Sequence, residues 1–139
     1  MVVVIDNSYL VPFFLPDEDP APTESLLRKV VEDDASLITP HLWLNEFGNV
    51  LLTCVRRGRL TAEAHSACLK QATLLPIAVQ SFPGLLFLDK VNLLAVKHQL
   101  SFYDATYLAL AIDRNGLLAT LDKQLRKAAV AEGVLYGLK

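Results

Sequence analysis

The chain contains short runs of consecutive apolar residues, each bounded by polar, proline or glycine residues. Five of these runs predict β-strands: Val2–Ile5, Ser36–Thr39, Pro76–Val79, Leu117–Thr120 and Val134–Tyr136. Apolar and polar residues do not alternate strictly within them, which is typical of strands that are covered on both faces of a parallel sheet.

The segments between these runs have the apolar spacing of helices. Helices are predicted over residues 8–14, 23–31, 41–57, 83–99 and 122–131, with one more capped by Thr61 and another beginning near Ser101. Gly58 and Gly116 are placed to end two of them. The stretch PDEDPAP, residues 16–22, predicts an acidic, proline-rich loop and is the one candidate for a flexible segment.

Strands that alternate with helices predict a mostly parallel central sheet with helices on both faces, which is a three-layer α/β/α fold. A chain of 139 residues is long enough to bury one core, and it contains neither an internal repeat nor a low-complexity tract. We therefore predict a single α/β domain over residues 1–139.

The amino-acid composition is rich in apolar residues and slightly acidic, and both features bear on what the protein can bind. Apolar residues make up 53% of the chain and charged residues only 20%, so some apolar surface is expected to contact a partner. The net charge is −2, from 13 basic and 15 acidic side chains, which argues against a protein that coats nucleic acid by charge alone.

The expected location is the cytoplasm. The VVVI run is too short for the apolar core of a signal peptide, and no apolar stretch approaches the length of a membrane helix. Cys54 and Cys68 lack metal-ligand spacing and are interpreted as buried thiols in a reducing compartment.

Four acidic residues stand where a parallel sheet binds ligands or where a helix is otherwise apolar. Asp6 follows the first predicted strand and Asp122 follows the fourth by one residue, so both fall at carboxyl ends of strands. Asp104 opens the apolar helix SFYDATYLALA, and Glu46 lies among the apolar residues of HLWLNEFGNVL.

Each of these acids also has a purely structural explanation. Asp122 and Asp6 can cap the helices that follow them, and Asp104 gains from the dipole of its own helix. Glu46 can be solvated on the outer face of its helix; if it is buried without a partner, its carboxylate costs several kcal/mol. Clustered carboxylates repel one another and are tolerated around a hard divalent cation, so the four together favour a site for Mg²⁺ or Mn²⁺.

The chain resembles the PIN-domain ribonucleases, and most closely the VapC-type toxins of bacterial and archaeal toxin–antitoxin pairs. The resemblance rests on four stretches, in order and at similar spacing: VVVIDNSYL, NEFGNVLLTCVRRGRLT, SFYDATYLALA and LLATLDKQLRKAA. It covers essentially the whole chain. The acidic metal-site positions of the family fall on Asp6, Glu46, Asp104 and Asp122.

The resemblance implies a PIN-like fold and a metal-dependent endoribonuclease, in which Mg²⁺ or Mn²⁺ activates the water that attacks an RNA phosphodiester. Ser8, Asn49 and Thr120 fall on positions that support the metal site in the family. It also implies a homodimer that a cognate antitoxin protein holds inactive. RNA would be held by the metal and by local cations, for which Lys123, Arg126 and Lys127 are candidates, although such residues more often simply form a solvated helix face.

The sequence also allows other functions to be weighed against an endoribonuclease. A catalytically silent PIN-fold module for binding or assembly stays open. A haloacid-type phosphatase is disfavoured because Asp6-Asn7-Ser8 lacks the second aspartate of the Asp-x-Asp motif that such enzymes need. The stretch YLVPFFLP is interpreted either as a partner contact, with Phe13 and Phe14 exposed, or as a satellite core cluster under the acidic loop.

Overall fold

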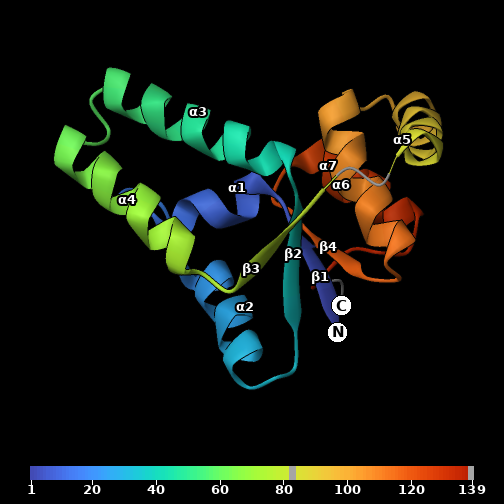
Figure 1. Cartoon of the computed structure of the whole chain (residues 1–139), viewed down its shortest axis with the longest axis horizontal. Helices are drawn as coiled ribbons and strands as arrows, with labels where there is room; N and C mark the ends of the chain where they lie inside the picture. The colour runs from blue at the N-terminus through green and yellow to red at the C-terminus, as the bar shows by residue number, and fades with distance from the viewer. Residues whose placement is uncertain (82–83, 138–139) are drawn as a thin grey trace.

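The computed structural model describes residues 1–81 and 84–137 (Figure 1). Its four strands are β1 (Val2–Ile5), β2 (Ser36–Pro40), β3 (Ile77–Gln80) and β4 (Leu117–Ala119). Its helices are α1 (Asn7–Leu10), the 3-10 helix η1 (Val11–Phe13), α2 (Ala21–Val31), α3 (Leu42–Arg56), α4 (Ala62–Leu74), α5 (Leu85–His98), α6 (Phe102–Asp113) and α7 (Lys123–Ala131).

The strands form one parallel sheet in the order β3-β2-β1-β4. In the two pairings of β1, Val3 lies opposite Leu37 of β2 on one side and Leu117 of β4 on the other. Strands β2 and β3 follow one another on one side of β1, whereas β4 lies on its other side, so the direction of winding reverses at β1. Open parallel sheets bind ligands beyond the carboxyl ends of the strands at such a point.

Helices cover both faces of the sheet, as the three-layer prediction requires. Helices α1 to α4 gather on one side of the sheet and α5, α6 and α7 on the other (Figure 1). Residues 105–111 of α6 are all buried, and α6 contacts β1, β2 and β4. The apolar run of α6 therefore anchors this helix against the middle of the sheet.

The close approach of the chain at the start of β4 depends on a glycine. A Cβ atom on Gly116 would lie 2.7 Å from the backbone oxygen of Val2 and 3.1 Å from its side chain. Real Cβ atoms do not approach backbone oxygen so closely. Gly116 thus lets β4 pack beside β1, whereas the left-handed residue that follows the end of α6 is Asn115, with a φ of 51°.

The predicted final strand at Val134–Tyr136 is reduced to an isolated parallel bridge between Leu118 and Leu135. The backbone of Leu118 donates to Val134 at 2.7 Å and accepts from Tyr136 at 3.0 Å. Gly133 and Gly137 both have positive φ angles, of 72° and 78°, so the backbone turns on each side of the bridge before a longer ladder can form.

The predicted helix over residues 8–14 is divided into α1 and η1. Pro12 lies at the beginning of η1 and lacks the N–H group that would continue an α-helix. Helix α2 begins two residues earlier than predicted, with Pro22 within its first two positions, where proline is tolerated. The predicted start of the fifth helix at Pro83 lies outside the described residues, and α5 begins at Leu85.

Of the two interpretations of YLVPFFLP, the exposed Phe13–Phe14 pair is wrong and the core cluster is confirmed. Phe14 is only 9% exposed and meets Phe13 and Phe47 edge-on, with ring centroids 5.1 and 5.2 Å apart, and Phe13 is partly buried. Trp43 stacks on Phe47 at 5.1 Å and completes an aromatic cluster. The stretch YLVPFFLP is therefore part of the core under the acidic loop, because the rings find partners on α3.

The exposed apolar surface lies mainly on α5 instead. Four of its large apolar side chains are more than two-thirds exposed: Leu85, Leu86, Leu93 and Val96. Within the described residues, no helix combines the length and the apolar character needed to cross a membrane.

Candidate active site

A cleft of about 450 Å³ opens at the edge of the sheet where β1 and β4 end. Its lining residues are Asp6, Asn7, Ser8, Val11, Pro12, Glu18, Glu46, Val50, Asp104, Leu121 and Asp122. All four acids predicted for the site are among them, although they come from four separate parts of the chain. Adjacent parallel strands bring Asp6 and Asp122 to one edge, while α3 and α6 supply Glu46 and Asp104.

Asp6 is held by three hydrogen bonds and is only 5% exposed. It caps α1, with Oδ1 accepting from the backbone N–H of Asn7 at 2.6 Å. Its Oδ2 accepts from the hydroxyls of Ser8 at 2.6 Å and Thr120 at 2.7 Å. Both carboxylate oxygens are thus fixed by donors from α1 and from the end of β4.

The two hydroxyl groups also bind the backbone between β4 and α7. Ser8 Oγ accepts from the N–H of Leu121 at 3.0 Å, and Thr120 Oγ1 accepts from the N–H of Asp122 at 3.1 Å. Their oxygens lie 3.2 Å apart, but each hydroxyl has a single proton and donates it in a hydrogen bond to the Asp6 carboxylate, so the two hydroxyls do not bond to each other. Ser8 and Thr120 therefore tie the position of Asp6 to that of Asp122.

Asp122 is the N-cap of α7. Its Oδ1 accepts from the N–H of Leu125 at 2.9 Å, so the structural explanation for this residue holds. The side chain is nevertheless exposed in the cleft, and within the described residues its Oδ2 has no hydrogen-bond partner. Capping uses one oxygen and leaves the other available to a ligand.

Asp104 is half-buried in the first turn of α6, where Ser101 is the N-cap and accepts from the Asp104 N–H at 3.1 Å. Glu46 is also partly buried, on the face of α3 that turns toward α6. The hydroxyl of Tyr107 donates to its Oε1 at 2.8 Å. Asn49, one turn further along α3, is exposed and is not among the residues that line the cleft.

Burial raises the pKa values of the carboxyl groups of Asp6, Glu46 and Asp104 above their ordinary values. Mutual repulsion raises them further: Asp122 acts on Asp6, Asp6 and Asp104 act on Glu46, and Asp6 and Asp122 act on Asp104. Hydrogen bonds oppose these effects only in part. The cleft therefore concentrates negative charge that its own residues do not neutralise, since no lysine, arginine or histidine is among the described residues that line it.

The donor set suits a hard divalent cation. Every candidate ligand is a carboxylate oxygen, and the buried Asn7 beside them has an Oδ1 that lacks a hydrogen-bond partner within the described part of the chain. As the side chains stand, the described His, Cys, Asp and Glu residues form no group of three or more that would hold an ion by themselves. Mg²⁺ and Mn²⁺ prefer oxygen ligands, and Mg²⁺ is commonly bound by one or two carboxylates with several waters, so the donor chemistry of the cleft fits these ions and lacks the His and Cys ligands of a closed zinc site.

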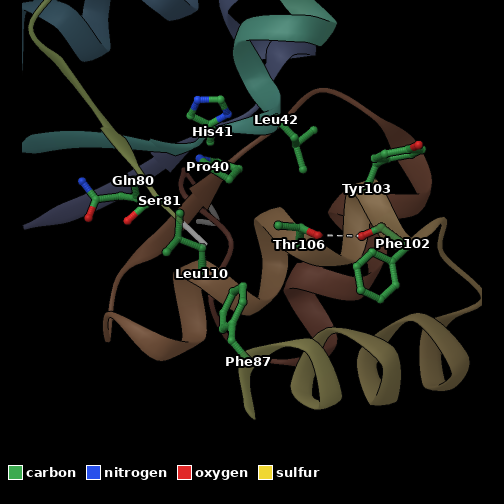
Figure 2. A pocket seen from close by; sticks show the side chains of 10 residues that line it. All are labelled: Pro40, His41, Leu42, Gln80, Ser81, Phe87, Phe102, Tyr103, Thr106 and Leu110. Atoms are coloured by element: carbon green, nitrogen blue, oxygen red, sulfur yellow. Dashed lines mark hydrogen bonds between the residues drawn. The ribbon is translucent and has the colours of Figure 1, made fainter. Parts of the chain in front are cut away.

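A second pocket, of about 170 Å³, lies at the carboxyl ends of β2 and β3 against α6 (Figure 2). It is lined by Pro40, His41, Leu42, Gln80, Ser81, Phe87, Phe102, Tyr103, Thr106 and Leu110. These residues include no carboxylate, and the Thr106 hydroxyl donates within its own helix, to the Phe102 carbonyl at 2.8 Å. The cluster of acids is thus confined to the first cleft.

Sequence reasoning missed two residues of the site. Glu18 lines the cleft from the acidic loop, which Arg59 holds by ion pairs to Asp17 at 3.0 Å and to Glu18 at 3.2 Å. Tyr107 belongs to the apolar run SFYDATYLALA and lies in the core, but its hydroxyl reaches Glu46. A buried tyrosine hydroxyl needs a hydrogen-bond partner, so a tyrosine in an apolar run was the one sequence feature that indicated a polar contact here.

Comparison with known proteins identifies the family of the chain. Residues 3–131 match the PIN domain family. Ribonuclease VapC3 of Pyrobaculum aerophilum is 32% identical over 125 residues, which cover 90% of this chain and 92% of that protein. The chain belongs to the PIN domain family. Within that family, its similarity to Ribonuclease VapC3 places it among the VapC-type ribonucleases.

Two solved structures share the fold over most of the chain. The crystal structure of PAE2754 from Pyrobaculum aerophilum has a TM-score of 0.70 and 29% identity, covering 93% of this chain and 80% of that one. The crystal structure of VapC20 from Mycobacterium tuberculosis, described as a toxin that cleaves the sarcin-ricin loop, has a TM-score of 0.66 and 17% identity, covering 96% of both chains.

Proposed function

We propose that this chain is a metal-dependent endoribonuclease that hydrolyses RNA phosphodiester bonds, and that it is the toxin of a toxin–antitoxin pair. The observation that carries the proposal is the convergence of Asp6, Glu46, Asp104 and Asp122 on one cleft without a compensating cation among its described lining residues. The whole-length similarity to Ribonuclease VapC3 supports the choice of RNA as the substrate.

The four carboxylates would hold Mg²⁺ or Mn²⁺, directly or through waters. When bound, the ion supplies hydroxide at neutral pH and offsets the charge that builds up on the phosphate during attack. The chain contributes a rigid Asp6, fixed by three donors, and an Asp122 that is fixed by its cap. Ser8 and Thr120 are proposed to act through Asp6, and Asn49 is proposed to act from the rim of the cleft.

RNA must approach a cleft that is acidic until metal binds. Lys123 and Lys127 of α7 are exposed and are the local cations proposed to contact RNA phosphates. Arg126 is partly buried and donates to the Thr120 carbonyl at 3.1 Å, so it also supports the end of β4. The bound cation and these side chains together would offset the net negative charge of the chain.

The test is cleavage of RNA by the purified chain in Mn²⁺, Mg²⁺ or excess chelator. We expect cleavage only with metal, leaving 5′-phosphate and 3′-hydroxyl ends. Asp104→Asn should lower the rate at least a hundredfold, because charge stabilisation at such a site is worth several kcal/mol. Asp113→Asn is the matched control on the same helix, since Asp113 pairs with Lys90 away from the cleft.

Cleavage that persists in chelator, or equal activity of Asp104→Asn and Asp113→Asn, would contradict the assignment of the site. A folded wild-type chain that binds RNA or a partner but cleaves nothing with either metal would instead indicate the silent assembly module.

An antitoxin protein and a second copy of the chain are the proposed partners. The exposed apolar side chains of α5 support a protein partner, since soluble proteins rarely leave such a surface uncovered. A cytoplasmic location is proposed with them, and the two buried free thiols, Cys54 and Cys68, suit a reducing compartment.

A further inference from the structure

The fully buried side chain of Tyr107 links the protein core to the acidic cleft. It is 0% exposed and is among the largest fully buried side chains of the chain. Its hydroxyl donates to Glu46 Oε1 at 2.8 Å, and this contact joins α6 to α3. Tyr107 thus has its ring in the core and its polar atom at the site.

The contact engages only one of the two carboxylate oxygens of Glu46. Oε1 accepts from Tyr107, whereas Oε2 has no hydrogen-bond partner in the part of the chain that the structure describes. Without the tyrosine, a glutamate on α3 would sample several rotamers, because its side chain has three rotatable bonds and Glu46 makes no other hydrogen bond within the same residues. The hydroxyl therefore selects one position for the carboxylate of this cleft-lining residue and leaves its second oxygen available to a ligand.

Tyr107 also lies three residues after Asp104 on α6, which places the two side chains on neighbouring positions of the helix surface. The same helix thus presents one carboxylate directly and holds a second one through a hydroxyl. Because residues 105–111 are all buried, α6 has little freedom to move relative to the sheet. The separation between Asp104 and Glu46 is set by a packed element instead of by two independent side chains.

We propose that Tyr107 is a positioning residue for the metal site: its hydroxyl orients Glu46 so that one carboxylate oxygen is available to a divalent cation. The proposal rests on the proposed function, since it assumes that the cleft binds a cation. The competing explanation is that Glu46 merely satisfies a buried hydroxyl and takes no part in binding.

The experiment compares Tyr107→Phe with Tyr9→Phe. Both variants remove one hydroxyl from a buried ring, but the Tyr9 hydroxyl donates to the Pro22 carbonyl at 3.3 Å and has no contact with the four acids. Mn²⁺ affinity is measured by calorimetric titration without RNA. We expect Tyr107→Phe to bind Mn²⁺ about tenfold more weakly than wild type, as is usual when a partner of a metal ligand is lost, and Tyr9→Phe to bind as wild type.

A double-mutant cycle with Glu46→Gln assigns the effect to the contact. If Tyr107 acts through Glu46, adding Tyr107→Phe to Glu46→Gln should cause little further loss of Mn²⁺ affinity. For RNA cleavage, Tyr107→Phe should lower kcat and leave KM nearly unchanged. Wild-type Mn²⁺ affinity in a folded Tyr107→Phe, or additive losses in the double variant, would overturn the proposal.

The wild-type chain offers a test that does not depend on the folding of the variant. In NMR spectra of protein with ¹³C-labelled tyrosine, Mg²⁺ should shift the hydroxyl-bearing ring carbon of Tyr107, assigned by elimination with Tyr9→Phe, Tyr103→Phe and Tyr136→Phe. An unshifted signal at saturating Mg²⁺ would contradict the proposal. If wild type neither binds metal nor cleaves RNA, the proposed function itself fails, which is a separate outcome.

Discussion

The four predicted carboxylates of the cleft are held in different ways. Asp6 is fixed through both oxygens, Asp122 through the N-cap bond of α7, and Glu46 through a tyrosine hydroxyl. Asp104 depends on the rigidity of α6 itself. The site thus combines fixed carboxylates with free oxygens, which suits an ion that needs a defined set of ligands but keeps several waters.

Repulsion among these acids predicts a pH dependence of stability without metal. Burial and the charges of Asp6 and Asp122 raise the pKa of Asp104 above its ordinary value of 3.8. A carboxyl whose pKa is raised on folding contributes stability that is present below its unfolded pKa and is lost as the pH rises through its folded pKa. In chelator, Asp104→Asn should therefore gain stability relative to wild type as the pH rises from about 4 upward.

We expect the Tm of Asp104→Asn minus that of wild type to increase by a few degrees between about pH 4 and about pH 8, the size of change that about 1 kcal/mol causes in a chain of this length. Thermal unfolding in chelator at several pH values measures it. Saturating Mn²⁺ should reverse the order, since wild type binds the ion more tightly. A difference that falls as the pH rises would mean that the Asp104 charge serves the helix dipole of α6 instead.

At the residue scale, the sequence predicted the acids of the cleft better than the contacts that hold them. Asp6 and Asp122 could be placed because strand ends of a parallel sheet share one edge. Tyr107 and Glu18 could not, since the partner of a buried hydroxyl and the path of a loop depend on tertiary packing. The roles of Ser8, Asn49 and Thr120 in metal binding stay predictions, although the bonds of Ser8 and Thr120 to Asp6 are consistent with them.

At the scale of elements, the N-cap residue of α7 combines a structural and a proposed chemical task. Asp122 caps the helix, and asparagine caps about as well as aspartate. The free energy of unfolding of Asp122→Asn should therefore stay within about 0.5 kcal/mol of wild type, whereas that of Asp122→Ala should fall by about 1 kcal/mol. Denaturant unfolding in chelator measures both, and equal losses would show that the cap contributes little.

The order and type of the elements followed from the sequence, but several boundaries did not. The four main strands lie where the apolar runs predicted them: β1, β2 and β4 are largely buried, whereas the edge strand β3 leaves Ala78 and Val79 exposed. The segment Val134–Tyr136 forms only one bridge, since flanking glycines with positive φ end the pairing. Phe14 is buried because it packs against Phe47 of α3, and no local pattern predicts a contact with a residue more than thirty positions away.

At the scale of the whole molecule, the high apolar content divides between the core and α5. If α5 is the surface of self-association, Leu86→Gln should weaken the dimer, because Leu86 is 81% exposed and contributes little to the fold. The free energy of unfolding of the monomeric Leu86→Gln variant should stay within about 0.5 kcal/mol of wild type. Sedimentation velocity over a range of concentrations measures the association. An unchanged dimer would place the interface elsewhere, and a monomeric wild type would contradict the homodimer.

The central claim is that the four carboxylates form a metal site for RNA hydrolysis, and the most direct test is RNA cleavage by Asp122→Asn in saturating Mn²⁺. This variant keeps the cap of α7 and removes only the charge. We predict a folded protein of near wild-type stability whose cleavage rate falls at least a hundredfold. A folded Asp122→Asn that cleaves RNA as fast as wild type would contradict the account.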